Sequence, residues 1–195
     1  MRECKSILLI KLDEIGDMIL ASPALKAIRV RYPSARITCV VRPEILPLVE
    51  HCPYVDQFLP MSRDFKTFGL AKLGLFARLL WFCARHRLFR QDCSWVLRTT
   101  PYAQECLLSL AAGARERVGW SNSELFWSRH CFTRIGDCEG AWHETVRLLA
   151  GVTERPPNAD GVATEVWLAP EDRGCTARLA AGTRHIAIGC NAARL

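Results

Sequence analysis

The stretch ILLIKLDEIGDMILASPAL, residues 7–25, decides the fold. It opens with a continuous apolar run, which is typical of a buried parallel strand. The run stops at a lysine, and three acidic residues follow within five positions: Asp13, Glu14 and Asp17. Gly16 comes just before the last acid, and a second apolar run with helical spacing then begins. The stretch therefore predicts a strand, a charged loop and a helix.

The rest of the chain alternates between strand-like and helix-like segments. Further strands are expected at residues 35–41, 55–60, 93–99, 116–120 and 185–190, and helices at residues 17–31, 43–52, 68–89, 101–114, 140–152 and 170–181. Residues 121–139 are expected to be irregular. The first helix either starts at Asp17 and bends, or restarts at Ser22-Pro23 with a serine cap and a first-turn proline. This alternation predicts an α/β fold with a Rossmann-like parallel sheet and helices on both faces.

Composition narrows the class of protein. The chain has 195 residues, which suits one large domain or one and a half small ones, and half of its residues are hydrophobic, enough for a core. Its net charge of +6 comes from scattered basic residues, which disfavours nucleic acid and suits an anionic substrate or an anionic membrane surface. Ten cysteines without a CxxC pair indicate free, reduced core residues of a cytosolic protein rather than a metal site. We expect no signal peptide, because residues 1–5 run straight into a strand.

The longest apolar region, residues 68–89, is interrupted by Lys72 and Arg78 and is not expected to span a membrane. It is interpreted as a largely buried or amphipathic helix with a basic C-terminal end. Two roles stay open for it: packing on the sheet, and resting against an anionic inner-membrane leaflet.

The acidic loop after the first strand lies where parallel α/β sheets bind ligands. One hypothesis is structural: Asp17 caps the helix N-terminus behind a turn glycine, Gly16. The other is chemical, because a carboxylate in a cleft can take a proton from a sugar hydroxyl. A phosphate-binding loop would be rich in glycine and free of acids, so this loop disfavours a dinucleotide-binding dehydrogenase.

Several segments, taken in order, resemble the N-terminal domain of glycosyltransferase family 9. This family comprises the heptosyltransferases that build the lipopolysaccharide inner core from ADP-heptose, and their relatives. The segments are the Gly16-Asp17 pair, SPALKAIR (22–29), YPSARIT (32–38), VRPE (41–44), PYVDQ (53–57), SWVLRTTPYAQECLLSLAAGARERVGW (94–120), HETVRLL (143–149) and IAIGCNAARL (186–195). The resemblance covers nearly the whole chain, and about half of the family's usual length.

The resemblance implies a GT-B architecture, in which two Rossmann-like domains face each other across a cleft. The N-terminal domain holds the acceptor and the C-terminal domain holds the nucleotide-sugar. Residues 1–182 would form the acceptor-side domain. Residues 183–195 would begin a donor-binding domain cut short at Leu195, with Asn191 in its donor-binding loop, or the strand at 185–190 would instead close the first sheet. We expect the chain alone to lack transferase activity.

The resemblance also implies an inverting transfer with no metal ion and no cofactor beyond the nucleotide-sugar substrate. The family's proposed base maps onto Asp17. The substrate-binding candidates are Asp13, Gly16, Arg42, Arg63 and Arg98. Asp13 would shape the loop or bind sugar hydroxyls, and the three arginines would either meet acidic or phosphorylated acceptor groups or be ordinary surface residues. His143 is expected to cap a helix or lie half-buried rather than face the cleft.

Three functions remain open at this point. The first is a heptosyltransferase-like glycosyltransferase that acts in the cytoplasm on a lipopolysaccharide core or similar glycolipid, in contact with the inner-membrane surface. The second is a non-catalytic acceptor-binding or interaction module derived from such an enzyme. The third is an unrelated nucleotide-binding α/β protein, which the absence of a glycine-rich phosphate loop disfavours.

Overall fold

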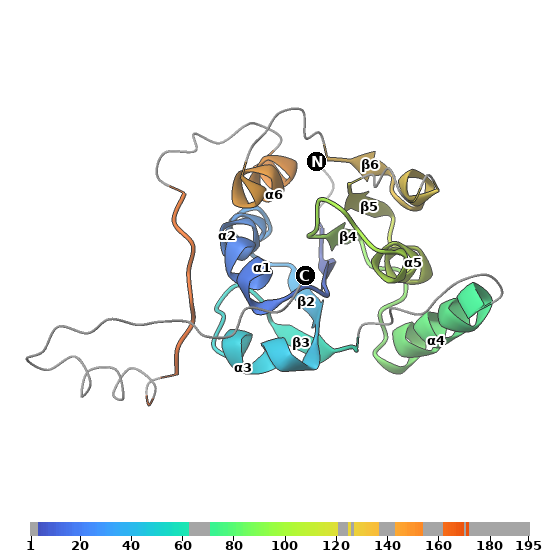
Figure 1. The fold of residues 1–195 in the computed structure, drawn as a ribbon, viewed down its shortest axis with the longest axis horizontal. Helices are drawn as coiled ribbons and strands as arrows, with labels where there is room; N and C mark the ends of the chain where they lie inside the picture. The colour runs from blue at the N-terminus through green and yellow to red at the C-terminus, as the bar shows by residue number, and fades with distance from the viewer. Residues whose placement is uncertain are drawn as a thin grey trace, which may run out of the picture.

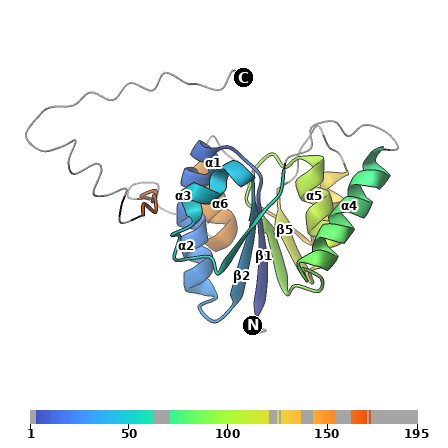
Figure 2. The same cartoon turned by 90° about the horizontal axis from the view of Figure 1, so that it is seen from below.

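A six-stranded sheet forms the centre of the molecule. The computed structural model describes residues 4–62, 71–120, 125, 127–136, 143–153, 162–169 and 171. The strand order is β3-β2-β1-β4-β5-β6, and every neighbouring pair is parallel. Helices cover both faces of the sheet, with α1, α2, α3 and α6 on one side and α4 and α5 on the other (Figure 1 and Figure 2). The predicted α/β fold with a Rossmann-like parallel sheet is therefore confirmed.

The elements follow the predicted order closely. The strands are β1 (Ser6–Lys11), β2 (Arg36–Val41), β3 (Gln57–Pro60), β4 (Cys93–Val96), β5 (Glu116–Gly119) and β6 (Arg134–Ile135). The helices are α1 (Ile15–Leu20), α2 (Ser22–Arg31), α3 (Leu46–Val49), α4 (Ala71–Arg85), α5 (Ala103–Ala111) and α6 (Glu144–Thr153), with short 3-10 turns η1 (Pro43–Ile45) and η2 (Ser128–Cys131). The short strand β6 lies in the segment that was expected to be irregular. The helix expected at 170–181 and the strand expected at 185–190 fall outside the described residues, except for Glu171.

Strand β1 lies at the centre of the sheet, between β2 and β4. Its residues from Ile7 onward are buried, because alternate side chains enter two separate cores. Ile7 and Leu9 pack on the side of α2 and α6, whereas Leu8 and Ile10 pack on the side of α4 and α5. Burial on both faces explains why this strand is apolar throughout instead of alternating.

A single carboxylate fixes the register of β4 on β1. The side chain of Asp92 accepts hydrogen bonds from the backbone N–H groups of Lys5 and Ser6, at 2.9 and 3.1 Å. The hydroxyl of Ser6 donates a third bond to the same oxygen at 3.2 Å. These bonds lower the pKa of Asp92, with the bond from Lys5 as the largest contribution. They join segments that lie 86 residues apart in the chain.

The helix expected at 17–31 is two helices, and the prediction that it restarts at Ser22 is confirmed. The predicted serine cap is wrong, because Ala21 occupies the N-cap position of α2. The Ser22 hydroxyl instead donates backward to the carbonyl of Ile19, at 2.6 Å. Pro23, in the first turn, gives up no helix hydrogen bond there, so it is tolerated at the start of α2.

The cysteines of the described residues are free thiols, and most are buried in the core. Burial raises the pKa of Cys52 and of Cys83 to about 11, and it raises the pKa of Cys39 still further. This agrees with the expectation of reduced core residues. Within the described ranges, no group of three or more histidine, cysteine or acidic residues could hold a metal ion. No helix in those ranges is long and apolar enough to cross a bilayer.

In the core beneath α6, the side chain of Trp120 fits because two residues next to it are glycines. Trp120, which follows β5, is 2% exposed, and its indole ring lies against Gly136 and Gly151. A Cβ atom added to Gly151 would lie 2.5 Å from Cζ2 of the ring, and one on Gly136 would lie 2.6 Å from its Nε1. Packing at this density leaves no room for an added side chain.

We expect Gly151→Ala to lower the free energy of unfolding by about 1–3 kcal/mol, because the clash with the indole ring outweighs the gain in helix propensity. Gly74→Ala in α4 is the matched control. A Cβ there meets nothing within 4 Å, so this substitution should raise stability by up to about 1 kcal/mol. Urea unfolding followed by circular dichroism measures both values, and equal effects of the two substitutions would contradict the packing described for Trp120.

Candidate functional site

The strand order places a topological switch point between β1 and β4. The chain builds outward from β1 to β2 and β3 on one side, and from β4 to β5 and β6 on the other. In open parallel sheets, ligands bind at the carboxyl ends of the strands where the order reverses. Here that edge carries the loops after β1 and β4 and the helix α1, opposite the edge where the chain begins (Figure 2).

A buried ion cluster occupies this switch point. Lys11, the last residue of β1, is 1% exposed, and Asp13, two residues later, is 2% exposed. The Nζ atom of Lys11 lies 2.7 Å from Oδ2 of Asp13, and the guanidinium group of Arg98 contacts Oδ1 of the same carboxylate. Asp13 therefore bridges a cation at the end of β1 and a cation in the loop after β4, on the two sides of the switch point. We refer to Lys11, Asp13 and Arg98 as the ion cluster.

The electrostatic environment of Lys11 extends to three more acids. The pKa of Lys11 is lowered to about 8, mainly by burial and to a smaller extent by the nearby positive charge of Arg98. The carboxylates of Asp17, Glu144 and Glu105 act in the opposite direction. Asp17 thus lies within the electrostatic reach of the buried ammonium group, on the same edge of the sheet.

Glu144 ties the start of α6 to the loop after β4. The hydroxyl of Thr99 donates to Oε2 of Glu144 at 2.7 Å, and the backbone N–H of Thr99 donates to Oε1 at 3.4 Å. His143, the preceding residue, is exposed, and its Nδ1 accepts a bond from the backbone N–H of Thr145 at 3.4 Å. The expectation that His143 caps a helix is therefore confirmed.

Asp17 lies in the first turn of α1 and is half-buried. The prediction that it is the N-cap residue is wrong. Glu14 occupies the N-cap position with an extended backbone, and no side chain makes a capping hydrogen bond there. The interpretation of Gly16 as a turn glycine is also wrong, because Gly16 is within the helix and its φ is not positive. A Cβ on Gly16 would meet nothing within 4 Å, so the glycine leaves open space beside Asp17.

Arg42 follows β2 and joins two loops of the same edge. Its guanidinium group contacts the carboxylate of Glu14, and its Nε lies 3.2 Å from Oε2 of Glu44. Arg98 is held on three sides: by Asp13, by the carbonyl of Thr100 at 2.8 Å, and by the ring of Tyr102, whose centroid lies 4.1 Å from Cζ. Both predicted arginines are therefore at the switch-point edge and already contact acids. Arg63 and Asn191 lie outside the described residues.

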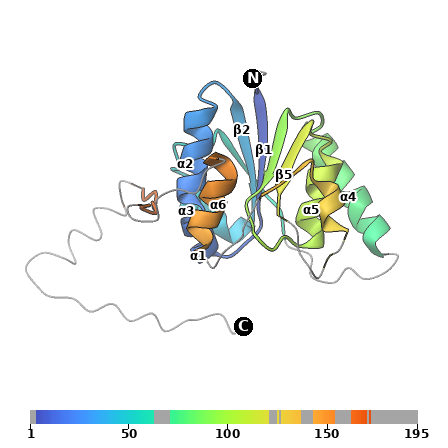
Figure 3. The same ribbon diagram turned by 90° about the horizontal axis from the view of Figure 1, so that it is seen from above.

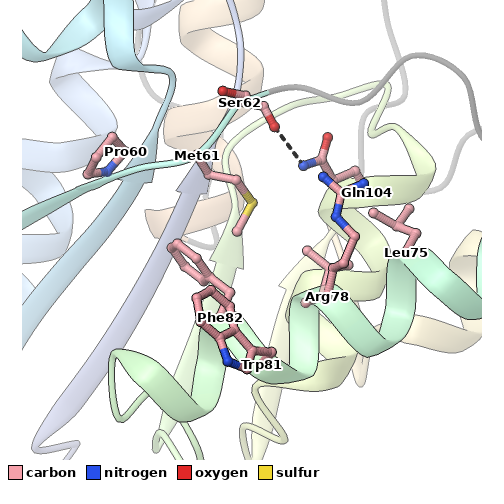
Figure 4. A pocket seen from close by; sticks show the side chains of 9 residues that line it. Pro60, Met61, Ser62, Leu75, Arg78, Trp81, Phe82 and Gln104 are labelled. Atoms are coloured by element: carbon pink, nitrogen blue, oxygen red, sulfur yellow. Dashed lines mark hydrogen bonds between the residues drawn. The ribbon is translucent and has the colours of Figure 1, made fainter.

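A pocket of about 360 Å³ lies beside this edge, between the loop after β3 and helix α4 (Figure 4). The side-chain amide of Gln104, from α5, donates to the carbonyl of Ser62 at 3.0 Å at its boundary. The pocket combines apolar walls with one cation, and its lining is Pro60, Met61, Ser62, Leu75, Arg78, Leu79, Trp81, Phe82 and Gln104. This pocket was not predicted from the sequence.

Lys11, Thr99 and Glu144 are the site residues that sequence reasoning missed. Lys11 could have been noticed in the sequence, because it is a charged residue at the end of an apolar strand, where its side chain is partly or fully buried. Thr99 and Glu144 left none, since their contact joins two segments that are 45 residues apart.

The fold and the switch point together define a Rossmann-like domain of the kind found in GT-B glycosyltransferases. Its fold matches a family 9 glycosyltransferase from Veillonella parvula, with a TM-score of 0.69 and 19% identity over 92% of this chain. It also matches the ADP-heptose lipopolysaccharide heptosyltransferase II of E. coli, with a TM-score of 0.66 and 20% identity over 89% of this chain.

A third match is E. coli heptosyltransferase WaaC with ADP-2-deoxy-2-fluoro heptose, with a TM-score of 0.59 and 15% identity over 80% of this chain. This chain covers 49%, 50% and 51% of the three solved structures, so it spans about half of their length. No protein-family model and no curated protein sequence matches the chain. At these identities the comparisons establish the shared fold.

The ion cluster predicts an unusual dependence of stability on pH. The folded-state pKa of Lys11 is about 8, below its ordinary 10.5, so the unfolded chain binds more protons between these values. The contribution of Lys11 to stability should therefore rise by about 3 kcal/mol as the pH increases from 8 to 10.5. The difference in unfolding free energy between the wild type and Lys11→Met should shift by that amount in favour of the wild type.

The exposed Lys26 provides the control, because its hydrogen bond to Glu165 raises its pKa. Urea unfolding of Lys26→Met over the same pH range should show no such shift. A constant difference between the wild type and Lys11→Met would mean that Lys11 keeps an ordinary pKa in the folded protein.

Proposed function

We propose that this chain is the acceptor-binding half of an inverting, heptosyltransferase-like glycosyltransferase. The proposed reaction transfers heptose from ADP-heptose to a lipopolysaccharide core or similar glycolipid. The observation that carries the proposal is the position of Asp17: a half-buried carboxylate at the switch point, within the electrostatic reach of Lys11, in a fold shared with heptosyltransferases. The resemblance in sequence around Gly16 and Asp17 supports the same assignment.

In the proposed reaction, Asp17 is the general base. Its carboxylate takes the proton of an acceptor hydroxyl as that oxygen attacks the anomeric carbon of the sugar. The bond between the anomeric carbon and the phosphate oxygen breaks, ADP leaves on the opposite face, and the configuration inverts. On the basis of the resemblance we propose that neither a metal ion nor a further cofactor takes part, and that the protein acts in the cytoplasm.

The acceptor side of the site would recognise negative charge. Arg42 contacts Glu14 and Glu44, and Arg98 contacts Asp13. Glu14 and Glu44 are both exposed, so an acidic or phosphorylated acceptor group can displace them from Arg42. Asp13 is buried and held by two cations, so Arg98 more readily orients the loop than binds a ligand. Arg63 remains a proposed third contact.

The donor side is proposed to lie mainly outside this chain. The chain spans about half of the matched structures, and its residues 183–195, with Asn191, are proposed to begin the donor-binding domain. We therefore expect the 195-residue chain to bind the acceptor but to release no ADP from ADP-heptose by itself. An acceptor-binding module without catalysis is the alternative that the experiments below distinguish.

We expect Asp17→Asn to lower kcat by about 10²–10⁴-fold, because the amide cannot accept the proton. The measurement uses this chain joined to the donor-binding half of E. coli heptosyltransferase II, with release of ADP in the presence of heptose-free core lipopolysaccharide. Glu14→Gln, which neutralises an acid in the same loop, is the matched control and should stay within a few fold of the parent.

Acceptor binding is measured separately by calorimetry on the 195-residue chain with the core oligosaccharide. Asp17→Asn should bind as the wild type does, whereas Arg42→Ala should bind more weakly. Full turnover by the Asp17→Asn chimera would exclude Asp17 as the base. Acceptor binding with an inactive parent chimera would favour the non-catalytic module, and tight binding of ADP by the chain alone would favour a nucleotide-binding protein instead.

A further inference from the structure

Helix α4 forms the outer layer on its side of the sheet (Figure 2 and Figure 3). Its inner face is apolar: Leu75, Leu79 and Cys83 are buried in the core that also contains residues of α5. Packing on the sheet, one of the two roles expected for the segment at 68–89, is therefore confirmed for this face of α4.

The outer face of α4 is also apolar. Leu73 is 71% exposed and Trp81 is 64% exposed, and Leu80 lies beside them. The exposed Ala77 and Ala84 complete the same side of the helix. Residues spaced by four and seven positions share one side of an α-helix, so these side chains form a continuous stripe. We call these five residues the α4 face.

The α4 face is bordered by positive charge. Between residues 71 and 90 the chain contains no aspartate or glutamate. Four arginines of this segment are exposed: Arg78, Arg85, Arg87 and Arg90. The guanidinium group of Arg85 lies over the ring of Trp81, with 5.6 Å between Cζ and the ring centroid. Phe89, which is 44% exposed, extends the apolar surface beyond the helix end.

Two of these arginines occupy backbone positions that normally favour glycine. Arg87 has φ of +55° and Arg90 has φ of +61°. The N–H of Leu88 bonds to the carbonyl of Cys83 at 2.8 Å, and that of Arg87 to the carbonyl of Ala84 at 3.2 Å. This is a Schellman motif with Arg87 at the left-handed position, where glycine is usual. Helix α5 uses glycine at its own end, since Gly113 has φ of +60°.

We propose that the α4 face binds the surface of a lipid bilayer that contains anionic lipids. Amphipathic helices with apolar side chains and basic borders lie in the plane of the bilayer interface. Tryptophan and arginine suit that depth, because the indole ring is amphipathic and the guanidinium group meets lipid phosphates. Arginine in place of glycine at strained positions adds charge to this border at a conformational cost.

Charge favours a bilayer over a protein partner. The α4 face is flanked by cations, with no acidic residue in the segment to set a specific pairing. The chain as a whole is also basic, at +6. This proposal rests on α4 and the turn that follows it, so it holds whether or not the chain takes part in sugar transfer.

Flotation with vesicles tests the proposal on the 195-residue chain. Vesicles of phosphatidylcholine with phosphatidylglycerol should retain the protein at least about tenfold better than phosphatidylcholine alone, and added salt should weaken the retention. The double variant Leu73→Ser/Trp81→Ser removes apolar contact, and Arg85→Glu reverses a charge. Both should lower binding by about tenfold.

Arg87→Gly separates binding from folding. Glycine suits the left-handed backbone, so this variant should be at least as stable as the wild type and still bind anionic vesicles more weakly. Val30→Ser and Arg36→Glu are the matched controls, because they change an exposed apolar residue and an exposed cation away from α4, and both should bind as the wild type does.

Three results would overturn the proposal. The first is a wild-type chain that anionic vesicles do not retain. The second is weakening by the controls that equals the weakening by the α4 variants. The third is a double variant Leu73→Ser/Trp81→Ser that binds anionic vesicles as the wild type does, because binding by the arginines alone would assign the α4 face to an acidic protein instead of the bilayer interface.

Discussion

Burial of a positive charge at the end of the central strand is the constraint on which the switch-point edge depends. The ammonium group of Lys11 cannot be desolvated alone, because burying an unpaired charge is costly. The carboxylate of Asp13 compensates for it and also contacts Arg98, and this contact joins the loops after β1 and β4. The first turn of α1, with Asp17, starts from this fixed loop. The carboxylate of Asp13 therefore compensates the buried charge of Lys11 and also positions the edge where the proposed chemistry takes place.

Much of the fold could be predicted from the sequence, because its signals are local. The two-sided burial of β1 produces a continuous apolar run, and the break at Ala21 is marked by Ser22 and Pro23 in the sequence. Strand β6 could not be predicted in this way. It has two residues, and only the pairing of Val118 with Arg134 and of Gly119 with Ile135 makes it a strand. A strand defined by its neighbour leaves no pattern of its own.

The candidate site was predictable in position but not in detail. The density of acids after β1 indicated Asp13 and Asp17, and their place after a strand indicated the right edge of the sheet. The contact between Asp13 and Arg98 could not be predicted in the same way, because the two residues follow different strands and only the assembled sheet brings them together. The N-cap position likewise depends on where the extended backbone turns into the helix, which is at Glu14 and not at Asp17. A sequence with three acidic residues close together does not show which of them stands at that point.

The central position of β1 has a consequence for how the molecule assembles during synthesis. Strand β1 leaves the ribosome first, and β2 and β3 can pair beside it, yet its other edge stays open until β4 has been made. The hydrogen bonds from Ser6 to Asp92 and the contact between Asp13 and Arg98 can form only after that. Contacts between residues so far apart in the chain form slowly. One edge of β1 therefore stays unpaired until β4 has been made, and the charged end of β1 is enclosed at that same stage.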